Sequence, residues 1–314
     1  MTAWTQSPRK VAVIGTGVIG NGWIIRFLAN GFDVVAYDPV EGAKTRTTQI
    51  INNAWDSVEQ VGLHPEADQN RLTFVSSIKE AVKEADLIQE NVPERIELKQ
   101  QVLADIDQHA KQDAIIASST SGLKPTILQE KMDNPEQLVV AHPFNPVYLL
   151  PLVEIVGGEA TTQNTINKAY QIYELANMKP MIIEKEIEGF IADRLMEALW
   201  REALHLVNDG IATTEEVDKA ITYGAGLRWA QMGPFMTFHL AGGEQGMRHM
   251  LEQFGPALKL PWTKLEAPEL TDELKECVIN GCESHAGERS VAELERKRNE
   301  FLVKLMDLVE DYWP

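Results

Sequence analysis

The feature that most constrains this chain is a glycine pattern set between a short apolar run and a helical stretch. The run Lys10–Ile14 is followed directly by Gly15, Gly17 and Gly20 in the spacing G-x-G-x-x-G, and the residues from Trp23 to Asn30 have the composition of a helix. Glycines in such a connection permit a tight turn, a close approach of a ligand to the backbone, and close packing of the helix on the strand. The pattern therefore predicts a strand–loop–helix unit whose helix N-terminus binds a phosphate group.

An acidic residue at the end of the next apolar run makes this signal more specific. Asp38 ends the run Phe32–Tyr37 and lies 23 residues after Gly15. A carboxylate in this place accepts hydrogen bonds from both ribose hydroxyls of a dinucleotide and repels a 2′-phosphate, so we predict NAD as the cofactor. The residues expected to bind it here are Asp38, Gly15, Gly17, Val18, Ile19 and Gly20. The alternative is an ordinary strand–turn–helix connection without a ligand.

Strand-like and helical segments alternate through the first half of the chain. Further apolar runs of strand length lie near residues 72–75, 86–90, 113–117, 138–141, 152–156 and 179–183. The alternation predicts an α/β fold with a doubly wound Rossmann-type sheet, and ligands at the carboxyl ends of its strands. From Gly189 the pattern is nearly pure helix, with a capping box predicted at Thr213 and Glu216. We expect an NAD-binding domain over residues 1–186 and an all-α substrate and dimerisation domain over 187–314.

Two of the apolar runs each carry one titratable residue. His142 ends the run 138–141, and twelve residues later Glu154 lies inside the run 152–156. A buried carboxylate without a partner is costly, and the Pro-rich segment between the runs can turn the chain back, so the two side chains could meet. An imidazole oriented by a carboxylate is a candidate general base. The alternative, which the two residues alone do not exclude, is a hydrogen-bonded core histidine and a glutamate on a solvated sheet face.

The charge of the chain disfavours two classes of partner. It has 47 acidic and 29 basic residues, which gives a net charge of −18, and such a surface repels nucleic-acid phosphates and anionic membranes. The first ten residues form no apolar signal segment, and no later apolar run approaches the ~20 residues of a membrane span. Cys277 and Cys282 are expected to be reduced thiols of a cytoplasmic protein. The histidines lack metal-ligand spacing, so no metal is predicted.

Several motifs occur together in a fixed order. They are the glycine loop, Ser118–Ser121, His142–Pro146, Glu154, Gly189–Ile191 and Met232–Pro234. Through these motifs the chain resembles the 3-hydroxyacyl-CoA dehydrogenase superfamily over essentially its whole length. The resemblance implies that the family's cofactor-contacting glutamate and lysine fall on Glu94 and Lys99.

The same resemblance implies a mechanism. His142 takes the proton of a C3 hydroxyl while the C3 hydride passes to the nicotinamide, and Glu154 fixes the tautomer of the imidazole and stabilises the imidazolium. The family's substrate-polarising residues fall on Ser121 and Asn145, which hold the oxygen as it becomes a carbonyl.

Departures from the acyl-CoA enzymes point to a small free substrate. Asp193 stands where those enzymes have an asparagine, and the segment Gly224–Pro234 is longer than its counterpart and contains Arg228. The stretch between Gly42 and Leu72 holds few of the cations that CoA phosphates would need. In these features the chain resembles the branch of the superfamily that acts on free 3-hydroxy acids.

Within that branch, the resemblance of the stretches 189–203 and 228–243 in the helical half implies a zwitterionic 3-hydroxy acid, L-carnitine, as the substrate. Arg228 would bind its carboxylate as a fork, although the arginine could instead pair with an acid at a subunit interface. Asp193 would face the trimethylammonium group, or alternatively pair with Arg194 or a neighbouring helix. Aromatic faces bind such a cation well. The aromatic candidates, each of which could also belong to the core, are Phe144, Tyr148, Trp200, Trp229, Phe235 and Phe238.

The remaining predictions concern the oligomeric state and the alternative functions of the chain. A wide apolar stripe that includes Leu195, Leu199 and Leu206 predicts a homodimer through the helical domain. Competing substrates are another free 3-hydroxy acid, such as L-gulonate, and a 3-hydroxyacyl-CoA. A crystallin-like NAD-binding structural protein is disfavoured because the whole set of site residues is intact. A serine hydrolase is set aside because Ser119 and Ser121 lack the G-x-S-x-G elbow.

Overall fold

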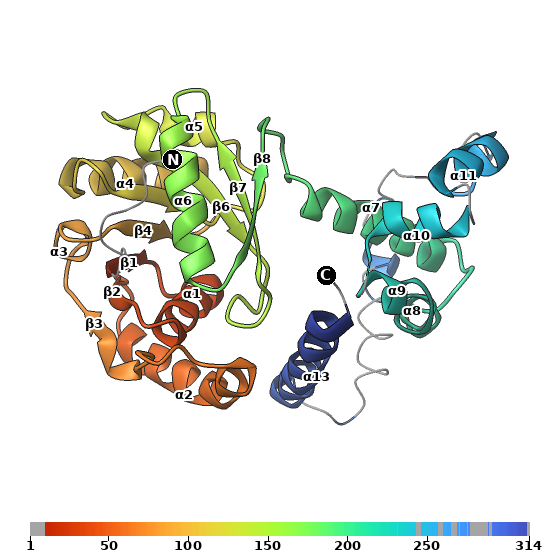
Figure 1. The fold of residues 1–314 in the computed structure, drawn as a ribbon, viewed down its shortest axis with the longest axis horizontal. Helices are drawn as coiled ribbons and strands as arrows, with labels where there is room; N and C mark the ends of the chain where they lie inside the picture. The colour runs from red at the N-terminus through yellow and green to blue at the C-terminus, as the bar shows by residue number, and fades with distance from the viewer. Residues whose placement is uncertain are drawn as a thin grey trace. The chain divides into compact units, whose positions relative to one another are not determined.

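The chain forms two compact units. The computed structural model describes residues 10–230, 232–242, 246–256, 260–264, 269, 271–274, 276, 288 and 291–312. The first unit ends at Asp193 and the second begins at Arg194 (Figure 1). Cys277 and Cys282, predicted to be reduced thiols, lie outside the described residues.

The first unit is built on one eight-stranded sheet. Its strands are β1 (Lys10–Ile14), β2 (Asp33–Tyr37), β3 (Leu72–Phe74), β4 (Leu87–Glu90), β5 (Ile115–Ser118), β6 (Leu138–Pro143), β7 (Leu152–Gly157) and β8 (Lys179–Ile183). Their order is β3-β2-β1-β4-β5-β6-β7-β8. The pairs from β3 to β6 are parallel, β7 runs antiparallel to β6, and β8 runs parallel to β7. The predicted doubly wound Rossmann-type sheet is confirmed.

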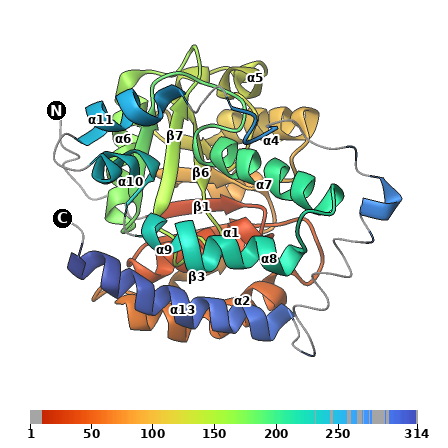
Figure 2. The ribbon, with the colours of Figure 1, turned by 90° about the vertical axis from the view of Figure 1, so that its right-hand side faces the viewer.

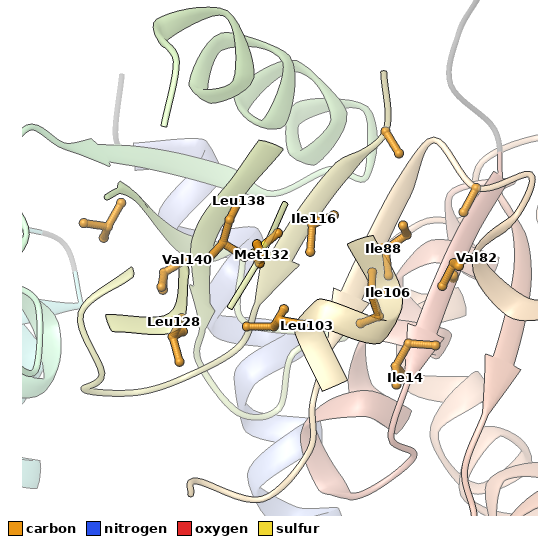
Figure 3. Packing of buried hydrophobic residues seen from close by; sticks show 14 of the residues in the cluster. Ile14, Val82, Ile88, Leu103, Ile106, Ile116, Leu128, Met132, Leu138 and Val140 are labelled. Atoms are coloured by element: carbon orange, nitrogen blue, oxygen red, sulfur yellow. The ribbon is translucent and has the colours of Figure 1, made fainter. Parts of the chain in front are cut away.

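Helices cover both faces of this sheet, so the central strands β1, β4, β5 and β6 are buried along nearly their whole length. The helices are α1 (Val18–Ala29), α2 (Ala43–Val61), α3 (Ile78–Val82), α4 (Ile96–His109), α5 (Pro125–Gln129) and α6 (Gln163–Leu175). Residues of α3, α4 and α5 pack with strand residues in one buried core (Figure 3), in which Ile88, Leu103 and Ile116 are fully buried. A second contact joins α1 to α6, where the Trp23 and Tyr173 rings lie 5.3 Å apart.

Helix α1 begins earlier than the sequence suggested. It was expected from Trp23, but it begins at Val18 and includes two glycines of the loop region. A Cβ atom on Gly20 would lie 1.9 Å from the carbonyl oxygen of the first loop glycine, and one on Gly22 would lie 2.9 Å from the Cβ of Val147. These glycines therefore belong to the helix, where they permit its close contact with the loop and with the segment after β6.

The predicted hairpin between His142 and Glu154 is confirmed as a structural element. Strands β6 and β7 pair antiparallel, and the register places His142 directly opposite Glu154. Because directly opposed residues of an antiparallel pair point to the same face, their side chains lie side by side.

All regular secondary structure in the described part of the second unit is helical. Helix α7 (Ala192–Asn208) leads into it, and the others are α8 (Thr214–Ala220), α9 (Gly226–Trp229), α10 (Pro234–Ala241), α11 (Gly246–Phe254) and α13 (Val291–Tyr312) (Figure 2). The capping box predicted at Thr213 and Glu216 is present, with each side chain bound to the other residue's backbone N–H. No helix in the described part of the chain has the length and apolarity needed to cross a membrane.

Candidate active site

The glycine loop leaves the N-terminus of α1 open. Gly15 has a φ of 88°, and a Cβ atom there would lie 2.9 Å from the carbonyl oxygen of Asn91. Gly17 is the N-cap of α1 and supplies no side-chain cap, and the first turn contains no acidic residue. The apolar side chain of Val18 is 71% exposed beside the loop. This cradle fits a pyrophosphate, because the first N–H groups of a helix have no intrahelical partner and the first turn of α1 holds no acidic residue.

Asp38 lies just after β2 and is oriented by the glycine loop. Its Oδ2 accepts hydrogen bonds from the Thr16 backbone N–H (2.7 Å) and the Thr16 hydroxyl (2.9 Å). Its Oδ1 accepts from the backbone N–H of Val40 at 2.9 Å. The carboxylate is half-exposed. The three groups that donate to it, two backbone N–H groups and one hydroxyl, carry no charge. A charged acceptor in this setting suits ribose hydroxyls and repels a phosphate.

His142 and Glu154 form a buried hydrogen-bonded pair. The Nδ1 atom of His142 lies 2.8 Å from Oε2 of Glu154, the histidine is 4% exposed, and the glutamate is fully buried. The other oxygen, Oε1, accepts from the backbone N–H groups of Ile191 and Ala192, both at 3.0 Å. Three donors therefore compensate the burial of one carboxylate. A neutral imidazole that donates from Nδ1 presents an unprotonated Nε2, which is the form that a base requires.

The Nε2 side of His142 faces a second carboxylate. Oδ2 of Asp193, in the first turn of α7, lies 3.7 Å from Nε2. The rings of Phe144 and Phe190 contact the imidazole, with centroid distances of 5.2 and 5.6 Å. The structure thus brings two predicted substrate residues, Asp193 and Phe144, to the predicted base. Phe190 was not predicted as a site residue.

Ser121 and Asn145 lie on loops at one edge of the sheet. Strands β5 and β6 are adjacent and parallel, and the two residues follow their carboxyl ends. Both residues are exposed. The Ser121 backbone N–H donates to Oε1 of Glu94 at 3.1 Å, and the hydroxyl of Thr120 donates to the same oxygen. Glu94 therefore orients the loop that carries Ser121.

Lys99 is buried against a carboxylate that sequence reasoning missed. The lysine is 1% exposed, and its Nζ donates to both oxygens of Glu90, at 2.9 and 3.1 Å, and to the Val92 carbonyl at 3.0 Å. Oε2 of Glu94 lies 3.4 Å from the same ammonium, and the Glu94 side chain is 46% exposed. The Ser118 hydroxyl also donates to Glu90. Glu94 is thus the accessible member of this cluster, and the cofactor contact of Lys99 stays a prediction.

A second polar network lies beneath the glycine loop. The Ser119 hydroxyl accepts from the Trp23 indole (3.1 Å) and the Gln89 amide (2.8 Å), and donates to Asn91 (2.7 Å). The Tyr173 hydroxyl donates to Gln89 at 2.5 Å, and burial raises the pKa of Tyr173 well above its usual value. The network joins α1, β4, β5 and α6. Its members are separated by up to 150 residues in sequence, so no local pattern could reveal it.

Arg26 connects the cofactor helix to the segment after β6. Its Nε donates to the Val147 carbonyl at 3.0 Å and one terminal nitrogen donates to the Asn177 carbonyl at 3.5 Å. Desolvation lowers its pKa to about 10. An arginine inside a helix that is apolar apart from Asn21 was the available signal for a buried polar link, and it was missed.

The remaining predicted residues divide between the two units. Tyr148 is half-buried in the segment after β6, whereas Arg228 and Trp229 are exposed on α9 of the second unit. The substrate roles of these three residues stay predictions. Within the described residues no group of three or more histidine, cysteine or carboxylate side chains is arranged to hold a metal ion.

Comparisons with known proteins agree with this architecture. Residues 10–187 match the NAD-binding domain of 3-hydroxyacyl-CoA dehydrogenase, and residues 189–279 match the C-terminal domain of the same family. An L-carnitine dehydrogenase of Oceanobacillus iheyensis is 78% identical over 98% of this chain and 100% of its own length. One of Bacillus cereus is 64% identical over 98% of this chain and 95% of its own.

Solved structures resemble both halves of the chain. The 5-formyl-3-hydroxy-2-methylpyridine 4-carboxylic acid 5-dehydrogenase, an NAD+-dependent dismutase, aligns with a TM-score of 0.81 at 28% identity, over 96% of this chain and 99% of its own. The (S)-3-hydroxybutyryl-CoA dehydrogenase of Ralstonia eutropha aligns with a TM-score of 0.63 at 26% identity, over 78% of this chain and 85% of its own. With its glycine loop and both domain matches, the chain belongs to the 3-hydroxyacyl-CoA dehydrogenase family and is an NAD-dependent dehydrogenase.

Proposed function

We propose that this dehydrogenase oxidises the C3 hydroxyl of L-carnitine to give 3-dehydrocarnitine. The observation that carries the proposal is a base beside an anion: Asp193 Oδ2 lies 3.7 Å from His142 Nε2. In L-carnitine the hydroxyl is on C3 and the trimethylammonium is on C4, so a base and an anion that serve neighbouring carbons must be close together. The names of relatives at 78% and 64% identity support the same substrate.

His142 supplies the proton acceptor in this reaction. Its Nε2 takes the hydroxyl proton, while the hydrogen bond from Nδ1 to Glu154 (2.8 Å) holds the ring in the required tautomer. The charge of Glu154 stabilises the imidazolium that forms, and the amides of Ile191 and Ala192 keep that carboxylate in place. NAD, when bound, supplies the acceptor for the hydride from C3.

Other residues orient the substrate and the cofactor. We assign Ser121 and Asn145 to the substrate oxygen, where their polar groups stabilise the developing carbonyl. Gly15, Gly17 and Gly20 with the start of α1 hold the pyrophosphate, and Asp38 accepts from the ribose hydroxyls. The further cofactor contacts are assigned to Val18, Ile19, Glu94 and Lys99, and the substrate contacts to Arg228, Trp229, Phe144 and Tyr148.

The assembly and compartment are part of the same proposal. Helix α7 exposes Leu195, Met196, Leu199 and Trp200, each at 42% or more of its side-chain surface. An exposed row of this size is typical of a subunit interface. We infer a homodimer formed through the helical domain and a cytoplasmic location.

A panel of four substrates tests the function. With NAD present, NADH formation is expected with L-carnitine and at most trace levels with D-carnitine, L-gulonate and 3-hydroxybutyryl-CoA. The reason is that only L-carnitine combines the C3 hydroxyl in the correct hand with a cation one carbon away. Absorbance at the NADH band measures all four rates. Turnover of L-gulonate with inert L-carnitine would overturn the proposal.

The substitution Asp193→Asn tests the proposed cation site. It preserves the shape and removes the charge, so KM for L-carnitine should rise about tenfold, which corresponds to about 1.4 kcal/mol of lost binding. A 3-hydroxy acid of the same chain length without the ammonium group is the matched control and should show a much smaller change. Equal losses for both substrates would remove the electrostatic role of Asp193.

A further inference from the structure

Phe190 has a backbone conformation that large residues rarely adopt. Its φ is 46°, in the left-handed region, and it follows Gly189, whose φ is 71°. The side chain is nevertheless fully buried. A bulky residue in this region is strained and persists only where the surrounding structure holds it, and such residues gather at functional sites.

Hydrogen bonds on both sides hold the segment around Phe190. Its own N–H donates to the Ile187 carbonyl at 3.3 Å. The next two N–H groups, of Ile191 and Ala192, donate to Oε1 of Glu154 at 3.0 Å each. Since Oε2 of Glu154 accepts from His142, one carboxylate fixes both this segment and the imidazole.

The Phe190 ring lies between the core and the imidazole. Phe190 belongs to the same buried cluster as Leu128, Leu138 and Val140; Figure 3 labels these last three residues. Its centroid is 5.6 Å from that of the His142 ring, at an interplanar angle of 46°. The preceding Gly189 also lies against the Ser121 loop, because a Cβ atom on Gly122 would be 3.7 Å from its nitrogen.

We propose that Phe190 is a positioning residue for His142, held in its left-handed conformation so that its ring fixes the plane of the imidazole. One hydrogen bond from Nδ1 to Glu154 leaves the imidazole free to rock about that bond, because the last side-chain torsion of histidine is broad. Contact with a ring anchored in the core removes this freedom and directs Nε2 toward its target. The inference rests on the proposed function, in which His142 is the general base.

The substitution Phe190→Leu tests the inference in the full-length protein. It removes the ring and keeps an apolar side chain, so kcat should fall about tenfold or more, because small displacements of a catalytic group cost that much. The NADH dissociation constant should stay within about twofold. In ligand-free protein labelled with ¹⁵N-histidine, the Nδ1–H resonance of His142, identified by its loss in His142→Gln, should broaden. Phe32→Leu, at another buried phenylalanine (4% exposed), is the control and should leave the resonance and kcat unchanged.

The Nδ1–H resonance of His142 distinguishes a failure of this inference from a failure of the proposed function. If L-carnitine is not oxidised by the unaltered protein, the proposed function fails, and a broadened resonance in Phe190→Leu still supports the positioning role. A sharp resonance in Phe190→Leu, or a kcat equal to that of the unaltered protein, would overturn it. If Phe190→Leu does not fold, the same measurements on Phe190→Met, which has a similar volume and no ring, decide the question.

Discussion

Replacement of His142 by alanine should lower kcat by about 10²–10⁴-fold, the usual contribution of a general base. Its Nδ1 pairs with Glu154, and its Nε2 lies 3.7 Å from Asp193, which we propose to face the substrate. NADH affinity should change little, because the pyrophosphate cradle at Gly15–Gly20 and the carboxylate of Asp38 are built from other elements. A loss in the chemical step with intact cofactor binding is the signature of a base.

Two variants make this result specific. His142→Gln retains a donor for the buried Glu154, so it separates the loss of the base from the cost of an uncompensated carboxylate. His109→Ala is the control, because His109 also pairs with a carboxylate, Asp105, at 3.2 Å, but on the exposed end of α4. It should retain full activity. Fluorescence titration with NADH and initial rates measure both quantities, and a parallel loss of NADH affinity in His142→Gln would mean that the histidine serves the cofactor site instead.

Local pattern was sufficient for the elements that place the site. The glycine spacing with Asp38 predicted the strand–loop–helix unit, because Gly15 has a positive φ and Gly20 lies too close to the Gly15 carbonyl for a side chain. The twelve-residue separation of His142 and Glu154 predicted a hairpin, because two apolar strands joined by a Pro-rich turn have few other arrangements. The helical half was recognised from its period and from the capping box at Thr213.

Features that depend on distant contacts were not predictable in this way. Phe190 lies in a motif that marks the family, but its left-handed φ follows from the anchoring of the next two amides on Glu154, 37 and 38 residues earlier. The link from Arg26 to the Val147 carbonyl spans 121 residues.

The ion pair of Glu90, in contrast, could have been predicted from the sequence. A carboxylate at the end of an apolar run, nine residues before a lysine, indicates a buried ion pair.

The substitution Glu90→Gln should lower the free energy of unfolding by about 3–5 kcal/mol, the cost of breaking a buried ion pair by removing one partner. The ammonium of Lys99 is 1% exposed and would lose its nearest negative charge, keeping the neutral glutamine oxygen, the Val92 carbonyl and the more distant Glu94 as partners. Urea unfolding followed by circular dichroism measures the change. Glu215→Gln is the matched control: Glu215 pairs with Lys219 at 2.6 Å, but both side chains are more than half exposed, so the free energy of unfolding should change little.

A double variant tests whether the pair, rather than either residue, determines this stability. Glu90→Gln combined with Lys99→Met removes both charges and keeps an acceptor for the Ser118 hydroxyl and the Val92 N–H, so it should recover most of the stability lost in Glu90→Gln alone. If Glu90→Gln costs no more than Glu215→Gln, the buried pair is not a stability determinant. The double variant also separates two roles of Lys99. A stable double variant that still binds NADH would assign Lys99 to the support of Glu94 and the Ser121 loop, whereas lost NADH binding in a stable protein would assign it to the cofactor.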